Sequence, residues 1–246
     1  MLKIARTSLE QARQVYPVLE QATGLFAQRL HQQLGEWMLL VEQAIDQAER
    51  RILQEQTVAA SDKIVSLFEP HTQIIQRGKA PPHETEFGHK VNFAEVEHGL
   101  ISDWQVIALG NPPDELLLPP LLYQHRRRFG HAPKVLAGDR GVFSPANEKL
   151  ARRLGVKKIA LPQRGYRTAR RKRHEKQRWF KKGQRFRNGI EGRISVVKRT
   201  VQLRRCPYHG LDGFERWIGW GILVANLVVI ARTLHKRRRG KRRVQN

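Results

Sequence analysis

The sequence predicts an α/β protein in which helices flank a mixed sheet, preceded by an N-terminal helical hairpin or bundle. Three observations support this class. Apolar residues in 5–58 recur at three- and four-residue steps, the period of a helix face. After Asp62, short apolar runs alternate with helical patterns, as expected when helices cover a sheet. The chain has 246 residues, 40% of them hydrophobic and 28% charged, which is typical of a folded protein.

The helical segment is expected to cover residues 1–60. Its apolar positions run from Leu9 to Ile52, and the positions between them are mostly polar. Pro17 and Gly35 interrupt the pattern, so the helices are expected to break there. Two or three antiparallel helices would result.

Five short apolar runs are expected to form one sheet, and two of them flank His98-Gly99 as the arms of a β-hairpin. The runs are 63–68, 86–94, 100–108, 134–138 and 157–161.

Helices are expected between and after these strands. Asp114 is placed to cap one, and Ser144 with Pro145 begins another that ends near Gly155. Two longer helices are expected over about 184–199 and 211–234. The α/β domain would then span 61–235, leaving 236–246 as a disordered tail because its charges are all basic.

The charge is unevenly distributed along the chain. Residues 1–150 hold 16 Lys and Arg against 18 Asp and Glu, whereas residues 151–246 hold 30 against 4. The net charge of +24 therefore comes from the second part, which predicts a polyanionic partner for it.

Cys206 is the single cysteine, so no internal disulfide can form and a cytoplasmic location is expected. The N-terminus has no apolar run typical of a signal peptide. Residues 217–231 are apolar but short for a bilayer span, which needs about 20 residues. Because Asn226 also interrupts them, we expect a buried helix and no membrane partner.

Asp139 directly follows the apolar run 134–138 and precedes Gly141. Sites in open α/β sheets form at the carboxyl ends of strands, so Asp139 could face a crevice there. It could equally cap its own turn, and the local sequence does not decide between the two.

Glu191 is the lone acid between Arg178 and Arg205. On a helix, Arg187 and Lys198 share its face, so a simple Arg187–Glu191 ion pair would explain it. The alternative is that Glu191 binds a hard cation, since carboxylate oxygens suit Mg²⁺ or Mn²⁺, while the surrounding bases bind nucleic-acid phosphates.

The spacing Arg187-x3-Glu191-x6-Lys198 resembles the R, E and K of the Y-R-E-K signature of bacterial insertion-sequence DDE transposases, although Gln184 stands at the tyrosine position. "GDRGVFSPANEKLARRLGVKKIALPQRG" resembles the segment around the second catalytic Asp of those enzymes. "TEFGHKV", "GNPPD" and "RNGIEGRISVVKR…YHGLDGFERWIGWGILVANL" resemble the ISNCY-like group. The resemblance covers about residues 60–235.

The resemblance implies an RNase H-like fold and DNA transposition by two Mg²⁺ or Mn²⁺ ions held on Asp, Asp and Glu. Asp139 and Glu191 would be the second and third acids, and thus catalytic and metal-binding residues. Element-end and target DNA would be the partner, together with a homodimer or a complementing full-length transposase. The DNA-binding residues would be Arg187, Lys198, Arg193, Arg199 and Arg140.

The family's first acid stands on a strand upstream of a helical insertion, and residues 1–60 resemble that insertion. Glu69 is a poor substitute because it follows the helices. The expectation is therefore a C-terminal portion of a transposase that lacks the first acid and is inactive alone. The alternative is a noncatalytic basic DNA- or RNA-binding protein.

Overall fold

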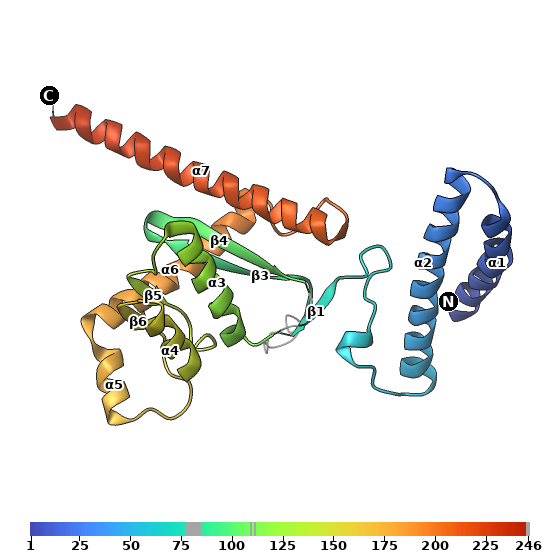
Figure 1. Cartoon of the computed structure of the whole chain (residues 1–246), viewed down its shortest axis with the longest axis horizontal. Coiled ribbons are helices and arrows are strands. Elements are labelled where there is room, and N and C mark those ends of the chain that lie inside the picture. The colour runs from blue at the N-terminus through green and yellow to red at the C-terminus, as the bar shows by residue number, and fades with distance from the viewer. Residues whose placement is uncertain (77–84, 109, 111, 245–246) are drawn as a thin grey trace. The chain divides into compact units, whose positions relative to one another are not determined.

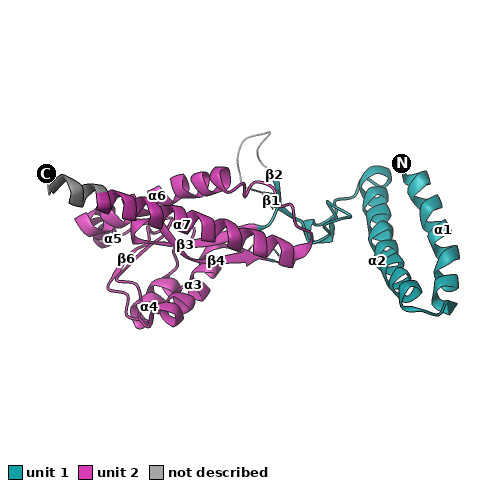
Figure 2. Ribbon diagram, turned by 90° about the horizontal axis from the view of Figure 1, so that it is seen from above, with its two compact units in different colours: residues 1–89, 108–110 teal, residues 90–107, 111–246 magenta. Residues whose placement is uncertain are grey.

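The computed structural model describes residues 1–76, 85–108, 110 and 112–244, with side chains described up to Arg238. The chain forms two compact units (Figure 2). The first comprises residues 1–89 and 108–110, and the second comprises residues 90–107 and 111–246.

The first unit begins with a helical hairpin, as predicted. Helix α1 (Leu2–Gln21) packs beside α2 (Leu25–Ala48), which continues into a π-helical turn, η1 (Glu49–Leu53) (Figure 1). The turn between them falls at Gly24, whose φ of 122° favours glycine.

The helix breaks predicted at Pro17 and Gly35 were wrong, since each residue lies inside a helix. Gly35 instead allows close helix packing: a Cβ atom there would lie 3.0 Å from the Tyr16 hydroxyl oxygen. A short 3-10 turn, η2 (Ala60–Asp62), follows the helices.

The strands form three two-stranded sheets and not the single sheet that was predicted. Periodicity identifies apolar runs but not their partners, and no strand among the described residues links one pair to the next. Residues 63–68 contain no strand. The pairs are β1 (Gln73–Gln76) with β2 (Thr85–Gly88), β3 (Lys90–Val96) with β4 (Leu100–Ile107), and β5 (Val135–Ala137) with β6 (Lys158–Ala160).

The predicted hairpin is confirmed as the antiparallel pair β3–β4 in the second unit. Its turn, η3 (Glu97–Gly99), contains two positive φ angles, 67° at His98 and 78° at Gly99. The parallel pair β5–β6 is connected by α4 (Pro145–Arg153), as expected for a parallel crossover.

Helix α4 begins as predicted. The Ser144 hydroxyl oxygen accepts a hydrogen bond from the Asn147 backbone N–H at 3.1 Å, and Pro145 occupies the first helical position. The cap predicted for Asp114 was wrong: helix α3 (Asp114–Phe129) starts at Asp114 itself, after Pro113.

Two apolar clusters hold the second unit together. One packs α3 and α4 against β6 through Leu118, Leu122, Ala151, Val156, Ile159 and Leu161. The other packs β4 against two later helices, α6 (Arg178–Thr200) and α7 (Gly210–Val244), through Ile101, Val197, Ile218 and Ile222.

The basic segment that follows β6 contains a further short helix, α5 (Ala169–Lys176), and α6 starts six residues before its predicted beginning at 184. Helix α7 continues to Val244, so the prediction of disorder was wrong for 236–244, whereas 245–246 lie outside the described residues. Lys and Arg are good helix formers, and cations at a helix C-terminus interact favourably with its dipole.

The buried helix predicted around 217–231 is buried on one face only. Ile218 and Ile222 pack in the core, whereas Trp220, Leu223, Leu227, Ile230 and Leu234 are exposed. Within the described part of the chain, Gly210–Arg238 forms a helix that is long and apolar enough to cross a membrane, and an 18-residue window inside it has a mean hydropathy of 1.7. Asn226 binds this helix to the hairpin, because its side-chain amide exchanges two 2.9 Å hydrogen bonds with the Ile101 backbone.

Candidate active site

Asp139 lies two residues beyond β5, at the carboxyl end of that strand. Its Oδ1 accepts a hydrogen bond from the Val142 N–H at 3.1 Å, which closes the turn. Its side chain keeps 39% of its surface exposed. Oδ1 therefore holds the loop, while Oδ2 contacts Arg187.

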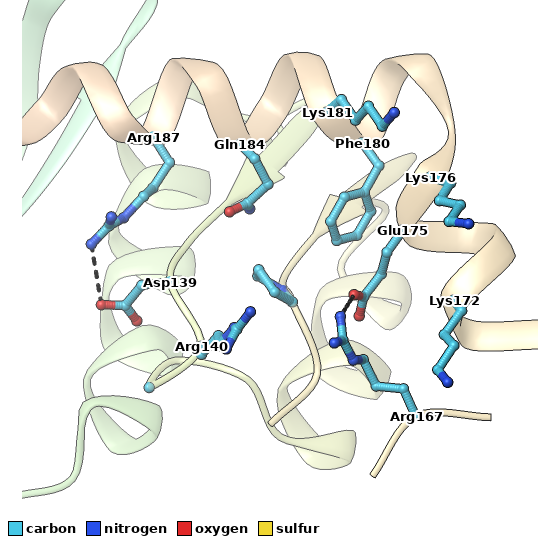
Figure 3. A pocket seen from close by; sticks show the side chains of 12 residues that line it. Asp139, Arg140, Arg167, Lys172, Glu175, Lys176, Phe180, Lys181, Gln184 and Arg187 are labelled. Atoms are coloured by element: carbon cyan, nitrogen blue, oxygen red, sulfur yellow. Dashed lines mark hydrogen bonds and ion pairs between the residues drawn. The ribbon is translucent and has the colours of Figure 1, made fainter. Parts of the chain in front are cut away.

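Arg187 brings the two predicted acids together. One of its terminal nitrogens lies 3.4 Å from Asp139 Oδ2, and the other lies 2.8 Å from Glu191 Oε1 (Figure 3 shows the contact with Asp139). Both carboxylates therefore contact a single guanidinium group. The i,i+4 ion pair expected on the helix is present, and it is joined to the end of β5.

Gln184 positions α6 on the two strand ends beside Asp139. Its side-chain N–H donates hydrogen bonds to the carbonyl oxygens of Gly138, at 3.1 Å, and Ala160, at 2.6 Å. Because Gly183 has no side chain, α6 can approach the strands this closely: a Cβ atom on Gly183 would lie 2.8 Å from the Cβ of Ala160. This role of Gln184 was not visible in the sequence, where it appeared only as a departure from a signature.

Asp114 is a further carboxylate near this site. From the sequence, it was predicted only to cap a helix. Its Oδ2 lies 2.8 Å from the position that a Cβ atom on Gly141 would occupy, and Asp139 Oδ1 lies 3.3 Å from the same point. Its other oxygen, Oδ1, forms an ion pair with Lys90. Asp114 and Asp139 therefore flank one glycine.

The start of α3 is fixed against the Asp139 loop by a buried amide. The Asn147 side chain, 4% exposed, donates hydrogen bonds to the carbonyl oxygens of Glu115 at 2.7 Å and Val142 at 2.9 Å. A buried polar group that is satisfied on both sides holds these backbones in one arrangement. The proximity of Asp114 to Asp139 is thus built into the packing.

A pocket of about 760 Å³ opens beside Asp139. Buried Phe180 packs at it, and the charged side chains that line it are mainly cationic (Figure 3). The cationic residues are Arg140, Arg167, Lys172, Lys176, Lys181 and Arg187, whereas Asp139 and Glu175 are the acids. Such a lining suits a polyanion.

An ion network holds the basic segment that borders this pocket. Arg171, with 12% of its side chain exposed, contacts Glu148 at 2.6 Å and Glu175 at 2.9 Å. Burial by itself would raise the pKa of Glu175, but hydrogen bonds from the Gln163 N–H, Arg171 and Arg167 outweigh it and leave this pKa below its usual range. Glu175 is therefore held as a carboxylate beside Arg171.

The other residues predicted to bind DNA fall in different environments. Arg140 and Lys198 are exposed, as is Arg199, whose Nε donates to the Ser195 carbonyl oxygen at 3.4 Å. Arg193 is half-buried and packs on the hairpin turn, where its Nη2 lies 1.8 Å from the position a Cβ on Gly99 would take. The structure thus brings Arg140 and Arg187 to the pocket and turns Arg193 toward the hairpin.

The donor set suits a hard cation. Within the described parts of the chain, no three His, Cys, Asp or Glu side chains stand together as a ready metal site. Asp114 and Asp139 nevertheless present oxygen atoms to the space beside Gly141. Glu191 contacts the same guanidinium group of Arg187 that contacts Asp139. Oxygen ligands are those that Mg²⁺ and Mn²⁺ take, so the residues present fit such an ion.

A protein-family model matches part of the chain. No curated protein and no solved structure matches the chain. Residues 146–231, which include Arg187 and Glu191 but not Asp139, match a family model described as "Transposase DDE domain". The segment from α4 into α7 is therefore similar to the DDE domain of transposases, the enzymes of DNA transposition.

Proposed function

We propose that the chain is the catalytic portion of an insertion-sequence DDE transposase of the ISNCY-like group, with an RNase H-like arrangement around Asp139 and Glu191. It binds element-end DNA and, once the missing first acid is supplied, carries out metal-dependent strand cleavage and transfer. The observation that carries the proposal is the Arg187 bridge between these two acids at a cation-lined pocket. The similarity of residues 146–231 to transposases supports it.

Asp139 and Glu191 would hold Mg²⁺ or Mn²⁺. When bound, such ions activate the attacking oxygen and stabilise the leaving one in phosphoryl transfer. Arg187 contacts both acids and so keeps two like charges close together. Arg187 would then contact the phosphate next to the scissile bond.

The DNA strand would follow the lysines and arginines of the pocket. Lys172, Lys176 and Lys181 are exposed there, and Arg140 lies directly beside Asp139. Each phosphate that such a cation neutralises releases a counterion, which supplies affinity without reading sequence. Lys198, on the Glu191 face of α6, would extend this path. The residues 236–246 would add further charge.

A further strand would complete the sheet. Among the described residues, β3 pairs with β4 alone and β5 with β6 alone, so each pair has an open edge. A strand carrying the family's first acid would join the two pairs beside Asp139. We propose that this acid comes from outside the described chain, by complementation from a full-length transposase in the cytoplasm.

Cleavage by the completed protein tests this function. The chain would be joined to a strand bearing the first acid and incubated, with Mg²⁺ or Mn²⁺, with duplexes made from the DNA that flanks its gene. The completed protein should cut them, whereas the chain by itself should cut weakly or not at all. Asp139→Asn and Glu191→Gln should each abolish cutting, because each keeps the shape and removes a metal-binding charge.

Glu215→Gln is the matched control, since Glu215 is an exposed acid on α7. It should cut like the unchanged protein. Cutting that survives Glu191→Gln would contradict the assignment and leave Glu191 as a helix ion pair. Binding without any cutting would favour the noncatalytic nucleic-acid-binding alternative.

A further inference from the structure

We infer that Asp114 is a metal ligand of this site, paired with Asp139 across Gly141. The inference rests on the proposed function, because it assigns a further residue to the same metal site. Asp114 begins α3, Asp139 follows β5 and Glu191 lies on α6, so three separate elements supply the carboxylates.

The space between the two aspartates is the first argument. Asp114 Oδ2 lies 2.8 Å, and Asp139 Oδ1 3.3 Å, from the position that a Cβ atom on Gly141 would occupy, and Asp139 Oδ1 also accepts the Val142 N–H. Any larger residue at 141 would put a carbon atom within 3.3 Å of both oxygens. Each carboxylate keeps 39% of its side chain exposed, so an ion can reach both from solvent.

The charge arrangement is the second argument. Two close carboxylates repel each other unless a cation lies nearby. Two side-chain cations serve this role here: Lys90 pairs with Asp114, and Arg187 contacts Asp139. A divalent ion bound between the aspartates would take over the charge compensation that Lys90 supplies.

The rigidity of the pair is the third argument. Asn147 ties the backbone at Glu115 to the backbone at Val142, and the Val142 N–H in turn binds Asp139. Both carboxylates are therefore attached to one buried hydrogen-bonded unit. A metal site needs ligands that are held in place before the ion arrives.

The test is Mn²⁺ binding by the whole chain, measured from the electron paramagnetic resonance signal of free Mn²⁺. Asp114→Asn should weaken binding by about tenfold or more, since loss of even an outer-shell partner costs 10- to 100-fold. Gly141→Ala, which alters no charge, should weaken it to a similar degree. Lys90→Met should strengthen binding by about threefold, because it removes a repelling charge.

Asp212→Asn is the control, an exposed acid at the start of α7, and should leave Mn²⁺ affinity unchanged. Circular dichroism confirms the fold of each variant, and the opposite sign expected for Lys90→Met separates a ligand role from general damage. Unchanged affinity in Asp114→Asn or Gly141→Ala overturns the inference. If Asp139→Asn and Glu191→Gln also bind Mn²⁺ normally, the metal site of the proposed function fails with it.

Discussion

Replacing Arg171 by Met should destabilise the second unit strongly. The guanidinium contacts Glu148 and Glu175, donates to the Leu161 carbonyl oxygen at 2.5 Å, and lies 4.9 Å from the centre of the Phe143 ring. Met preserves much of the side-chain volume but leaves two largely buried carboxylates without their cation. Removing one partner of a buried ion pair costs about 3–5 kcal/mol.

Urea unfolding followed by tryptophan fluorescence measures this loss. Arg170→Met is the matched control, because Arg170 is the preceding residue on α5 and is exposed; its effect should stay within about 0.5 kcal/mol. Adding Glu148→Gln and Glu175→Gln to Arg171→Met should recover part of the stability. If Arg171→Met costs no more than Arg170→Met, the network does not hold this segment.

The pH dependence follows from the lowered pKa of Glu175. A carboxyl whose pKa is lower in the folded state stabilises the fold above its unfolded pKa, about 4.3 for Glu. That stability is lost as the pH falls through the lower, folded pKa. The stability difference between the unchanged chain and Arg171→Met should therefore be full near pH 7 and shrink below about pH 4.

Three further outcomes are expected. DNA affinity should fall steeply with salt, because each phosphate contact adds about −0.9 to the slope of log K against the logarithm of the salt concentration. Deleting 236–246 should make this slope shallower in a filter-binding titration. A slope unaffected by the deletion would exclude the tail from binding. Asn226→Ala should cost about 1–3 kcal/mol in urea unfolding, since it leaves the Ile101 backbone unsatisfied; no loss would mean that water replaces the amide. The chain should not float with neutral phosphatidylcholine vesicles, because Asn226 holds α7 on the hairpin; flotation would instead favour a membrane-bound α7.

Local patterns predicted local elements well. The N-terminal helices, the β3–β4 hairpin and the Ser144 cap each depend on residues close in sequence, and each is present. The single sheet was wrong because strand pairing over long separations leaves no trace in periodicity. The tail was assigned disorder from charge repulsion, yet a continuous helix extends into it.

The candidate site was only partly visible in the sequence. Asp139 and Glu191 stood out as acids in distinctive settings, and Arg187 was placed on the Glu191 face. The roles of Gln184 and Asp114 depend on contacts between distant segments, with partners such as Gly138 and Gly141. Spacing along one element could not reveal these contacts.

Iron-directed cleavage of the protein tests the central claim, a shared metal site on Asp139 and Glu191, most directly. Fe²⁺ bound in place of Mg²⁺, with ascorbate and peroxide, cuts the backbone next to the ion, and mass spectrometry locates the cuts. We expect cuts around 138–141 and 190–192, suppressed by excess Mg²⁺ and absent in Asp139→Asn. Cuts confined to other segments, or cuts unchanged in that variant, would contradict the account.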